Sequence, residues 1–336
     1  MNKRYRTLFQ YIFFFGLGIF LVWWSVKDLT AADKSQIREA LRTARYLLFV
    51  PVLVILLLSH YIRALRWKLM ITPLGHNPAV KNTFFAVMIG YLTNLAFPRL
   101  GEVLKCTVLA RYENIPADKL IGTIIIERII DGLSLLIIFG ITLLIQPGIY
   151  SRIIDTFLNN PDTGTKQGSG FPFALLLGII VFLIIITWMI VKKKNLTDLV
   201  LLLKKITINI FKGVAAIGKL QKRGSFIFLT VVLWTLYLLG GYIGFFAFRE
   251  TSVYGLKEAF TILSAGSVGM IITPGGIGAY AVLLEKTMQL YGLQKGVALA
   301  FGWLLWIFQT GVILLGGLFS FVAMPYFNKK QSIEKI

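Results

Sequence analysis

Charged residues and cysteines are both scarce in this chain, and each scarcity excludes a class of protein. Only 15% of its 336 residues are charged, whereas 57% are hydrophobic. Several apolar runs reach the roughly 20 residues that cross a hydrocarbon core of about 30 Å, which excludes a soluble domain. The only cysteine, Cys106, cannot form an intramolecular disulfide or supply a thiolate metal cluster. The sequence is that of a polytopic integral membrane protein.

Motifs for metal, nucleotide or nucleophilic chemistry are also missing. The two histidines, His60 and His76, have no ligand partners at helical spacing, and no zinc, nucleophile-elbow or Walker pattern occurs. We therefore expect no enzymatic activity, no metal and no cofactor.

Basic residues outnumber acidic ones, 35 against 15, which gives a formal net charge of +20. They flank the apolar runs, so the excess indicates membrane topology and not nucleic-acid binding. The positive-inside rule puts most of these residues, including Arg63, Arg66 and Lys105, on the cytoplasmic side. It predicts a multi-pass protein of the cell (inner) membrane with both termini in the cytoplasm. The basic segment at residues 28–46 falls outside in this scheme, which counts against it.

Apolar runs predict an all-α fold with six spanning helices. The runs that are long enough to span are residues 8–26, 47–67, 120–145, 172–191, 225–248 and 296–322. The linker between the first two has helical periodicity and is predicted to be an interfacial helix. Residues 192–223 are predicted to be either an interfacial helix or a cytoplasmic connector.

Two shorter apolar stretches are interrupted by proline. Residues 83–97 and 258–273 stop at Pro98 and Pro274, and a second short helical piece follows each turn. Backbone that is interrupted at membrane depth must be buried in protein or line a polar cavity. We expect two re-entrant helical hairpins that enter the membrane from opposite faces.

The two hairpins and the spans that follow them share one pattern. An offset of 176 residues (274 minus 98) superposes Pro98 on Pro274 and the span 120–145 on 296–322, although sequence identity is near chance. This predicts an inverted repeat, with halves of about 83–145 and 258–322, inside a single membrane domain of residues 1–336. Inverted repeats with broken helices are typical of transporters.

Ionisable residues within predicted membrane segments are candidates for function, because such residues are rare there. Arg99 follows Pro98 in the first turn and precedes a half-helix whose N-terminus favours an anion. Its guanidinium suits a phosphate, while Glu102 would cap the helix or pair with Arg99. The alternative is that Arg99 and Glu102 only lock the turn.

A second group of charges lies within the span 120–145 and comprises Glu127, Arg128 and Asp131. The i, i+4 spacing puts both carboxylates on one face, where they would accept donors of a lipid headgroup or carry a coupling proton. A static ion-pair network is the alternative.

Glycines dominate the second turn, which begins at Pro274. Gly275, Gly276 and Gly278 permit positive φ and close backbone approach, so the amides of the next half-helix would form an anion nest. Tight helix packing is the alternative.

Four motifs, in their order and spacing, resemble the membrane domain of lysylphosphatidylglycerol synthases and its stand-alone, flippase-like relatives. They are Arg63-Ala-Leu-Arg66-Trp67, Asn94 with Pro98-Arg99-Leu100-Gly101-Glu102-Val103-Leu104-Lys105, Glu127-Arg128-Ile-Ile-Asp131, and Pro274-Gly275-Gly276-Ile277-Gly278. The resemblance covers about the whole chain. It implies re-entrant hairpins with Pro98, Gly101 and Pro274 as turn residues, and Asn94 and Lys105 as further substrate-binding residues. It also implies movement of a phospholipid or polyprenyl-phosphate-linked lipid between leaflets.

Two departures from that family bear on function. The sequence ends at Ile336 without a soluble aminoacyl-transferase domain, so aminoacylation is not expected. Relatives often have an acidic residue soon after the glycine turn, where this chain has Ala279-Tyr280-Ala281, so no role is carried over for that carboxylate.

We therefore expect a flippase-like lipid transporter. Its expected partner is a membrane phospholipid or polyprenyl-phosphate lipid and not nucleic acid, with a second copy of the chain or a lipid-modifying enzyme as further candidate partners. The alternative is a non-transporting membrane accessory that binds lipid or such an enzyme.

Overall fold

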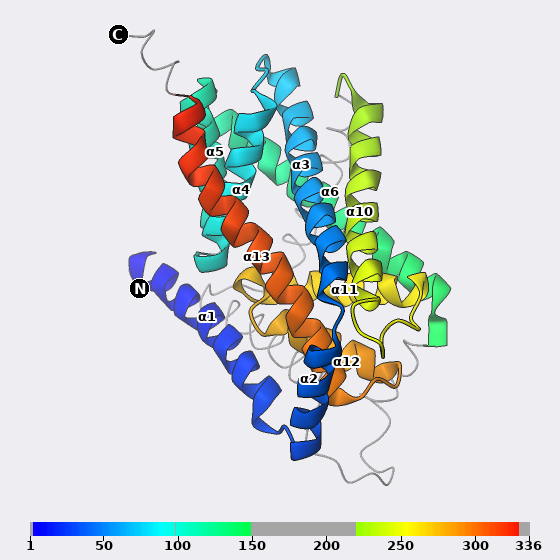
Figure 1. Ribbon diagram of the computed structural model, residues 1–336. Helices are drawn as coiled ribbons and strands as arrows, with labels where there is room; N and C mark the ends of the chain where they lie inside the picture. The colour runs from blue at the N-terminus through cyan, green and yellow to red at the C-terminus, as the bar shows by residue number, and fades with distance from the viewer. Residues whose placement is uncertain (1–2, 98, 149–219, 329–336) are drawn as a thin grey trace, which may run out of the picture. The chain divides into compact units, whose positions relative to one another are not determined.

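The computed structural model describes residues 3–97, 99–148 and 220–328, and these residues form helices and connecting turns without a strand (Figure 1). The α-helices are α1 (Lys3–Lys27), α2 (Ala31–Thr43), α3 (Phe49–Ile71), α4 (Val80–Ala96), α5 (Leu100–Glu113), α6 (Ala117–Ile145), α10 (Arg223–Phe245), α11 (Leu256–Ile272), α12 (Ala279–Leu290) and α13 (Lys295–Phe327). The all-α prediction is thus confirmed for the described residues.

Four helical segments are long and apolar enough to cross a membrane: Tyr46–Leu74, Ala117–Ile145, Arg223–Phe245 and Lys295–Phe327. A fifth is added if Phe15–Lys27 and Ala31–Thr43, which meet at an angle of 104°, form one broken span. The protein is therefore a multi-pass membrane protein. The predicted span 172–191 and most of the segment 192–223 lie outside the described residues, so the number of six crossings stays a prediction.

The predicted linker helix is present as α2. Thr30 caps its N-terminus, because the Thr30 side chain accepts a hydrogen bond from the Asp33 amide while the Asp33 carboxylate accepts one from the Thr30 amide. This reciprocal cap starts a new helix directly after α1 ends and gives the sharp bend between the two.

Both interrupted stretches form helical hairpins. Helices α4 and α5 pack against each other around the first break, where Arg99 has a φ of 69°. Helices α11 and α12 pack around the second, which holds the short 3-10 helix η4 (Pro274–Gly276). The predicted helix pairs are confirmed, while their re-entrant insertion and the inverted repeat stay predictions.

Among the four candidate spans, α13 is the most buried and α6 the least. Within the most apolar stretch of 18 residues, 56% of α13 but only 17% of α6 is buried. Helix α13 packs against α4, α12 and α2, and its Phe301 stacks on Phe245 of α10. This arrangement joins both hairpins to one long helix.

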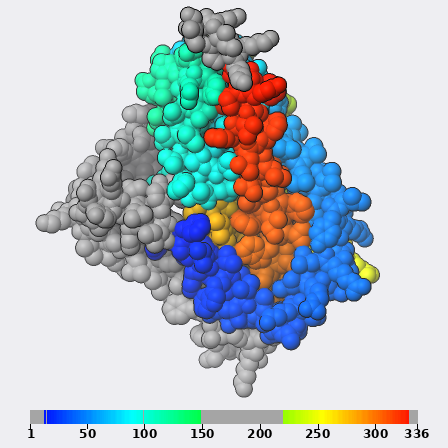
Figure 2. Space-filling model, turned by 60° about the vertical axis from the view of Figure 1, so that its left-hand side comes forward, coloured from blue at the N-terminus to red at the C-terminus, as the bar shows by residue number. Residues whose placement is uncertain are grey.

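Helix α1 packs against the second hairpin. The glycine residues Gly18 and Gly278 allow this, because a Cβ added to Gly278 would lie 2.7 Å from the Gly18 carbonyl oxygen. In Figure 2, α1 (blue) adjoins the gold and orange atoms of the later helices.

The chain divides into two compact units, residues 1–142 with 220–336 and residues 143–219. All contacts of the site lie within the first unit.

Candidate functional site

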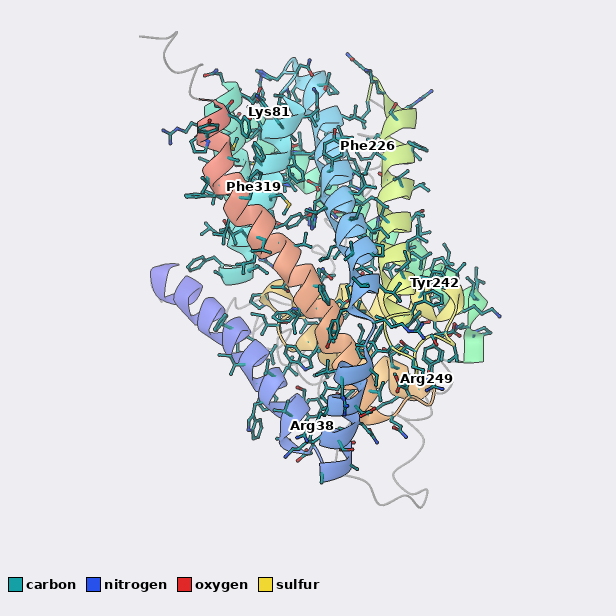
Figure 3. The ribbon with its side chains drawn as sticks, viewed as in Figure 1. Arg38, Lys81, Phe226, Tyr242, Arg249 and Phe319 are labelled. Atoms are coloured by element: carbon teal, nitrogen blue, oxygen red, sulfur yellow. The ribbon has the colours of Figure 1, made fainter. Side chains whose placement is uncertain are left out.

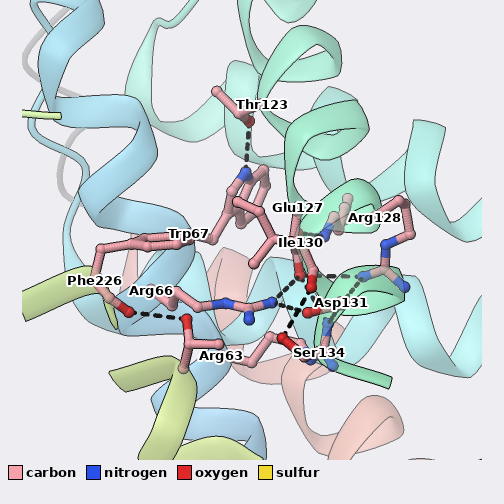
Figure 4. Close-up of polar contacts among 12 residues, drawn as sticks. Arg63, Arg66, Trp67, Thr123, Glu127, Arg128, Ile130, Asp131, Ser134 and Phe226 are labelled. Atoms are coloured by element: carbon pink, nitrogen blue, oxygen red, sulfur yellow. Dashed lines mark hydrogen bonds and ion pairs between the residues drawn. The ribbon is translucent and has the colours of Figure 1, made fainter. Parts of the chain in front are cut away.

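Six charged side chains from three helices form one connected cluster (Figure 4). Helix α6 supplies the carboxylates of Glu127 and Asp131. Arg63 Nη1, on α3, lies 2.9 Å from Glu127 Oε1 and 2.6 Å from Asp131 Oδ2. One turn along α3, Arg66 Nη2 lies 2.5 Å from Asp131 Oδ1. The spacing of three residues puts both guanidinium groups on the face of α3 that meets α6.

Helix α5 also contributes to the cluster. Lys105 Nζ donates a hydrogen bond to Glu127 Oε2 at 2.9 Å. On α6 itself, Arg128 Nη2 lies 3.1 Å from Glu127 Oε1 and 3.6 Å from Asp131 Oδ2. The Glu127 carboxylate therefore contacts cations from three helices.

The cluster carries more positive than negative charge. Four cations, Arg63, Arg66, Lys105 and Arg128, surround two carboxylates, an excess of two positive charges among the described residues. Arg63, Arg66 and Lys105 are buried and Glu127 is fully buried, whereas the Arg128 side chain is 42% exposed. Charges removed from water are costly unless they are paired, so an unbalanced buried cluster favours an anion.

Several donors of the cluster have no partner in the described part of the chain. These buried atoms are Arg63 Nε and both Nε and Nη1 of Arg66. Both ring nitrogens of His60, one turn before Arg63 on α3, are also unpartnered there. Buried polar groups are nearly always hydrogen-bonded, so these atoms mark a place where water or a ligand completes the structure.

Aromatic residues enclose the cations. The Lys105 ammonium lies 4.6 Å from the centre of the Trp67 ring, and the Arg66 guanidinium lies 5.8 Å from that of Phe226. Tyr237 of α10 accepts a hydrogen bond from Arg63 Nη2 at 3.1 Å. Cation–π contacts stabilise positive charge where water is excluded.

The predicted charges divide into two groups in the structure. Lys105, Glu127, Arg128 and Asp131 come together in the cluster. Arg99 is exposed at the start of α5 and, among the described residues, forms no salt bridge with Glu102. The described structure thus gives no support to the alternative in which these two lock the turn by pairing with each other. Glu102 lies in the first turn of α5, and no side-chain hydrogen bond caps the N-terminus of that helix at Arg99.

The remaining predicted residues of the first hairpin hold its turn together. The Asn94 side-chain oxygen accepts a hydrogen bond from the Gly101 amide at 2.9 Å. Gly101 lies against Gly90 on the other arm, where an added Cβ would be 1.9 Å from the Gly90 carbonyl oxygen. Pro98 lies outside the described residues.

The glycines of the second turn are closely packed. An added Cβ on Gly275 would lie 2.6 Å from a methyl carbon of Leu95 on α4, and one on Gly276 would lie 2.6 Å from the Met270 sulfur. The Gly275 carbonyl accepts a hydrogen bond from the Trp306 indole at 2.8 Å. Pro274, which precedes them, is buried. These contacts bring the second turn against the end of α4, and they favour the packing role of the glycines.

Arg63, Arg66 and Tyr237 were missed as site residues from the sequence. The two arginines were interpreted as flanking charges, but they are buried and pair with α6. Their signal was present, because two charges three residues apart within an apolar span share one helix face. Tyr237 gives no comparable signal, since a tyrosine in an apolar helix fits a membrane span without a polar partner.

The fold and the site define a class: a multi-pass helical membrane protein with a buried, cation-rich ion-pair cluster among three helices. The chain belongs to the family described as lysylphosphatidylglycerol synthase TM region, which matches residues 11–317. This confirms the family resemblance drawn from the sequence.

A second comparison finds a UPF0104 membrane protein, MJ1595, of Methanocaldococcus jannaschii. It is 32% identical over 78 residues, which cover 22% of this chain and 23% of that protein. The match thus spans about a quarter of the length of that relative. No solved structure significantly matches the chain.

Proposed function

We propose that this protein is a flippase-like transporter of the cell membrane. It moves an anionic lipid, either a phospholipid or a polyprenyl-phosphate-linked lipid, between leaflets, with both of its own termini in the cytoplasm. The observation that carries the proposal is the buried excess of positive charge on α3, α5 and α6. Membership of a family defined by its transmembrane region supports a function carried out on a substrate within the membrane.

The lipid phosphate is proposed to replace the carboxylates on the arginines. In the described state Asp131 bonds to both Arg63 and Arg66. Carboxylate and phosphate oxygens match the guanidinium group in the same way, so a phosphate exchanges for Asp131 without loss of charge-assisted hydrogen bonds. Asp131 and Glu127 then accept donors of the headgroup.

The exposed turn of the first hairpin supports a path for the lipid headgroup toward this site. Arg99 precedes α5 without a side-chain cap on that helix, and Lys105 lies further along the same helix in the cluster. A helix N-terminus with a nearby arginine attracts a phosphate. We assign the first contact with the headgroup to Arg99 and the deeper contact to the cluster.

Leaflet exchange in proteoliposomes tests the proposal. Fluorescent anionic and zwitterionic lipids are compared for the parent protein and for Arg66→Gln, Arg99→Gln, Glu102→Gln and Arg128→Gln. Loss of a charge-assisted phosphate contact at Arg66 is expected to slow exchange of the anionic lipid about tenfold or more. Arg66→Lys, which keeps the charge but not the fork of donors, is expected to recover part of the rate.

Arg249→Gln is the matched control, because Arg249 is exposed in the loop after α10 (Figure 3). Its exchange rate should equal that of the parent. Anionic-lipid exchange that is unchanged in the Arg66, Arg99 and Arg128 variants would rule the proposal out, provided that each variant elutes as a folded protein.

A non-transporting accessory that binds lipid or a lipid-modifying enzyme is the second candidate. The ion pairs that join three helices favour it, because such ties suit a rigid scaffold. It predicts that the parent protein binds anionic lipid in a pull-down with lipid-loaded beads while leaflet exchange stays at the protein-free rate.

A further inference from the structure

A groove separate from the charged cluster lies where the end of α3 meets the beginning of α10 and of α4. It is open to the surface, has a volume of about 520 Å³ and is lined by Leu65, Leu69, Phe228 and Leu229 on its apolar walls, with Lys68 and Lys222 among its lining residues. In Figure 1 these ends of α3 and α10 lie side by side, and the two helices pack along their length. The groove is thus bounded by two of the candidate membrane spans.

The groove and the cluster use different faces of the same two helices. On α10, Phe226 points to the Arg66 guanidinium of the cluster, whereas Phe228 and Leu229 line the groove. On α3, Arg66 is fully buried, and Leu65 and Leu69, four residues apart, share the groove face. A ligand in the groove therefore does not occupy the positions proposed for transport.

The charge of the groove lining favours an anion. Lys68 and Lys222 line it, and none of the residues that line it is acidic. Helix α10 begins there with Lys222 as its N-cap residue, without a side-chain cap and without an acidic residue in its first turn. The helix dipole and the amide groups of that turn add to the attraction of the two lysines.

The apolar walls require a ligand with a hydrocarbon part. Four large apolar side chains line the groove together with the lysines, on helices that are apolar enough to contact acyl chains. Lysines at the ends of spanning helices lie at the level of lipid headgroups, where each attracts an anionic lipid. The volume of the groove is also within the range of ligand pockets.

We propose that this groove binds an anionic membrane phospholipid. Its phosphate lies between Lys68, Lys222 and the first turn of α10, and one acyl chain lies along Leu65, Leu69, Phe228 and Leu229. This lipid is a bound neighbour and not the transported one, so the inference does not rest on the proposed transport activity.

Photo-crosslinking from inside the groove tests this directly. Phe228→p-benzoylphenylalanine is placed in the full chain, which is reconstituted in nanodiscs with equal amounts of phosphatidylglycerol and phosphatidylcholine. Irradiated protein is weighed by intact mass spectrometry. Phosphatidylglycerol adducts are expected to exceed phosphatidylcholine adducts, and Lys68→Gln and Lys222→Gln should each reduce that ratio about fivefold.

Lys81→Gln is the matched control, because Lys81 is an exposed lysine on α4 that lies near Phe327 and outside the groove (Figure 3). It should leave the adduct ratio unchanged. Equal yields of the two lipid adducts in the parent, or a ratio that both groove lysines leave unaltered, would overturn the proposal. Crosslinks that run mainly to another part of the same chain would overturn it as well.

Discussion

Lys105 donates a hydrogen bond to Glu127 at 2.9 Å and thereby ties the second arm of the first hairpin to α6. The same carboxylate accepts hydrogen bonds from Arg63 and Arg128. This fully buried carboxylate contacts cations from three helices and offsets part of the positive charge of the cluster. Two predictions about stability follow from this position.

Removal of the Glu127 charge should be strongly destabilising. Glu127→Gln leaves Arg63, Lys105 and Arg128 with one fewer anion in a buried setting, and breaking such a network costs about 3–5 kcal/mol. Equilibrium unfolding in mixed detergent micelles measures this loss. Asp118→Asn, in the exposed first turn of α6, is the control and should change the free energy of unfolding by less than about 0.5 kcal/mol. Similar values for the two variants would contradict the central role of Glu127.

Removal of the Lys105 charge should cost less than removal of the Glu127 charge. In Lys105→Met, Glu127 keeps contacts with Arg63 and Arg128, and the positive excess of the cluster falls by one. A buried ion pair adds little net stability once its remaining partner stays compensated. The same unfolding assay should give a loss of about 1.5–3 kcal/mol, the contribution of one hydrogen bond to a charged group. If Lys105→Met lowered the free energy of unfolding as much as Glu127→Gln does, the proposed excess of positive charge in the cluster would be contradicted.

The close packing of the first hairpin makes Gly101 sensitive to substitution, whereas an open glycine on α6 should not be. Gly101→Ala would place a Cβ 1.9 Å from the Gly90 carbonyl oxygen, so the arms α4 and α5 must separate. Overpacking of this kind costs about 1–3 kcal/mol. On α6, Gly132→Ala meets no atom within 4 Å and should instead stabilise the helix by about 0.5–1 kcal/mol. Thermal unfolding in detergent compares the two variants, and a Gly101→Ala protein as stable as the parent would contradict the close packing of the arms.

The sequence was sufficient for the helices but only for part of the site. Long apolar runs predicted α3, α6, α10 and α13, because helix length and hydropathy are local properties. Pro98 and Pro274 predicted where the two hairpins break, since proline ends a helix locally.

The pairing of charges was harder to predict because it depends on tertiary contacts. Arg63 and Asp131 are 68 residues apart, and no local pattern states that their helices meet. The positive-inside rule also gave Arg63 and Arg66 an adequate explanation as flanking charges, although both are buried. Depth within a span and the i, i+3 spacing would have separated them from residues such as Lys68 at the helix end.

A neutral hydrogen bond connects α3 and α6 beside the cluster, and its energy can be measured separately. The Trp67 indole N–H donates to the Thr123 hydroxyl at 2.8 Å, and both side chains are buried. Helix α6 is little buried among the described helices, so polar side chains provide much of its attachment. A double-mutant cycle with Trp67→Phe and Thr123→Val should give a coupling energy of about 0.5–1.5 kcal/mol.

The control cycle pairs Trp67→Phe with Ser134→Ala. Ser134 lies on the same helix as Thr123, but its hydroxyl donates to the Ile130 carbonyl of α6 itself. The two changes should therefore be additive within about 0.3–0.5 kcal/mol. Additivity of the Trp67 and Thr123 variants as well would mean that this hydrogen bond adds nothing to the attachment of α6 and that the charged cluster provides it at this level of the helix. A Glu127→Gln protein would then be held less firmly at α6, and trypsin would cleave faster at Lys119, in the first turn of α6, in that variant than in Trp67→Phe.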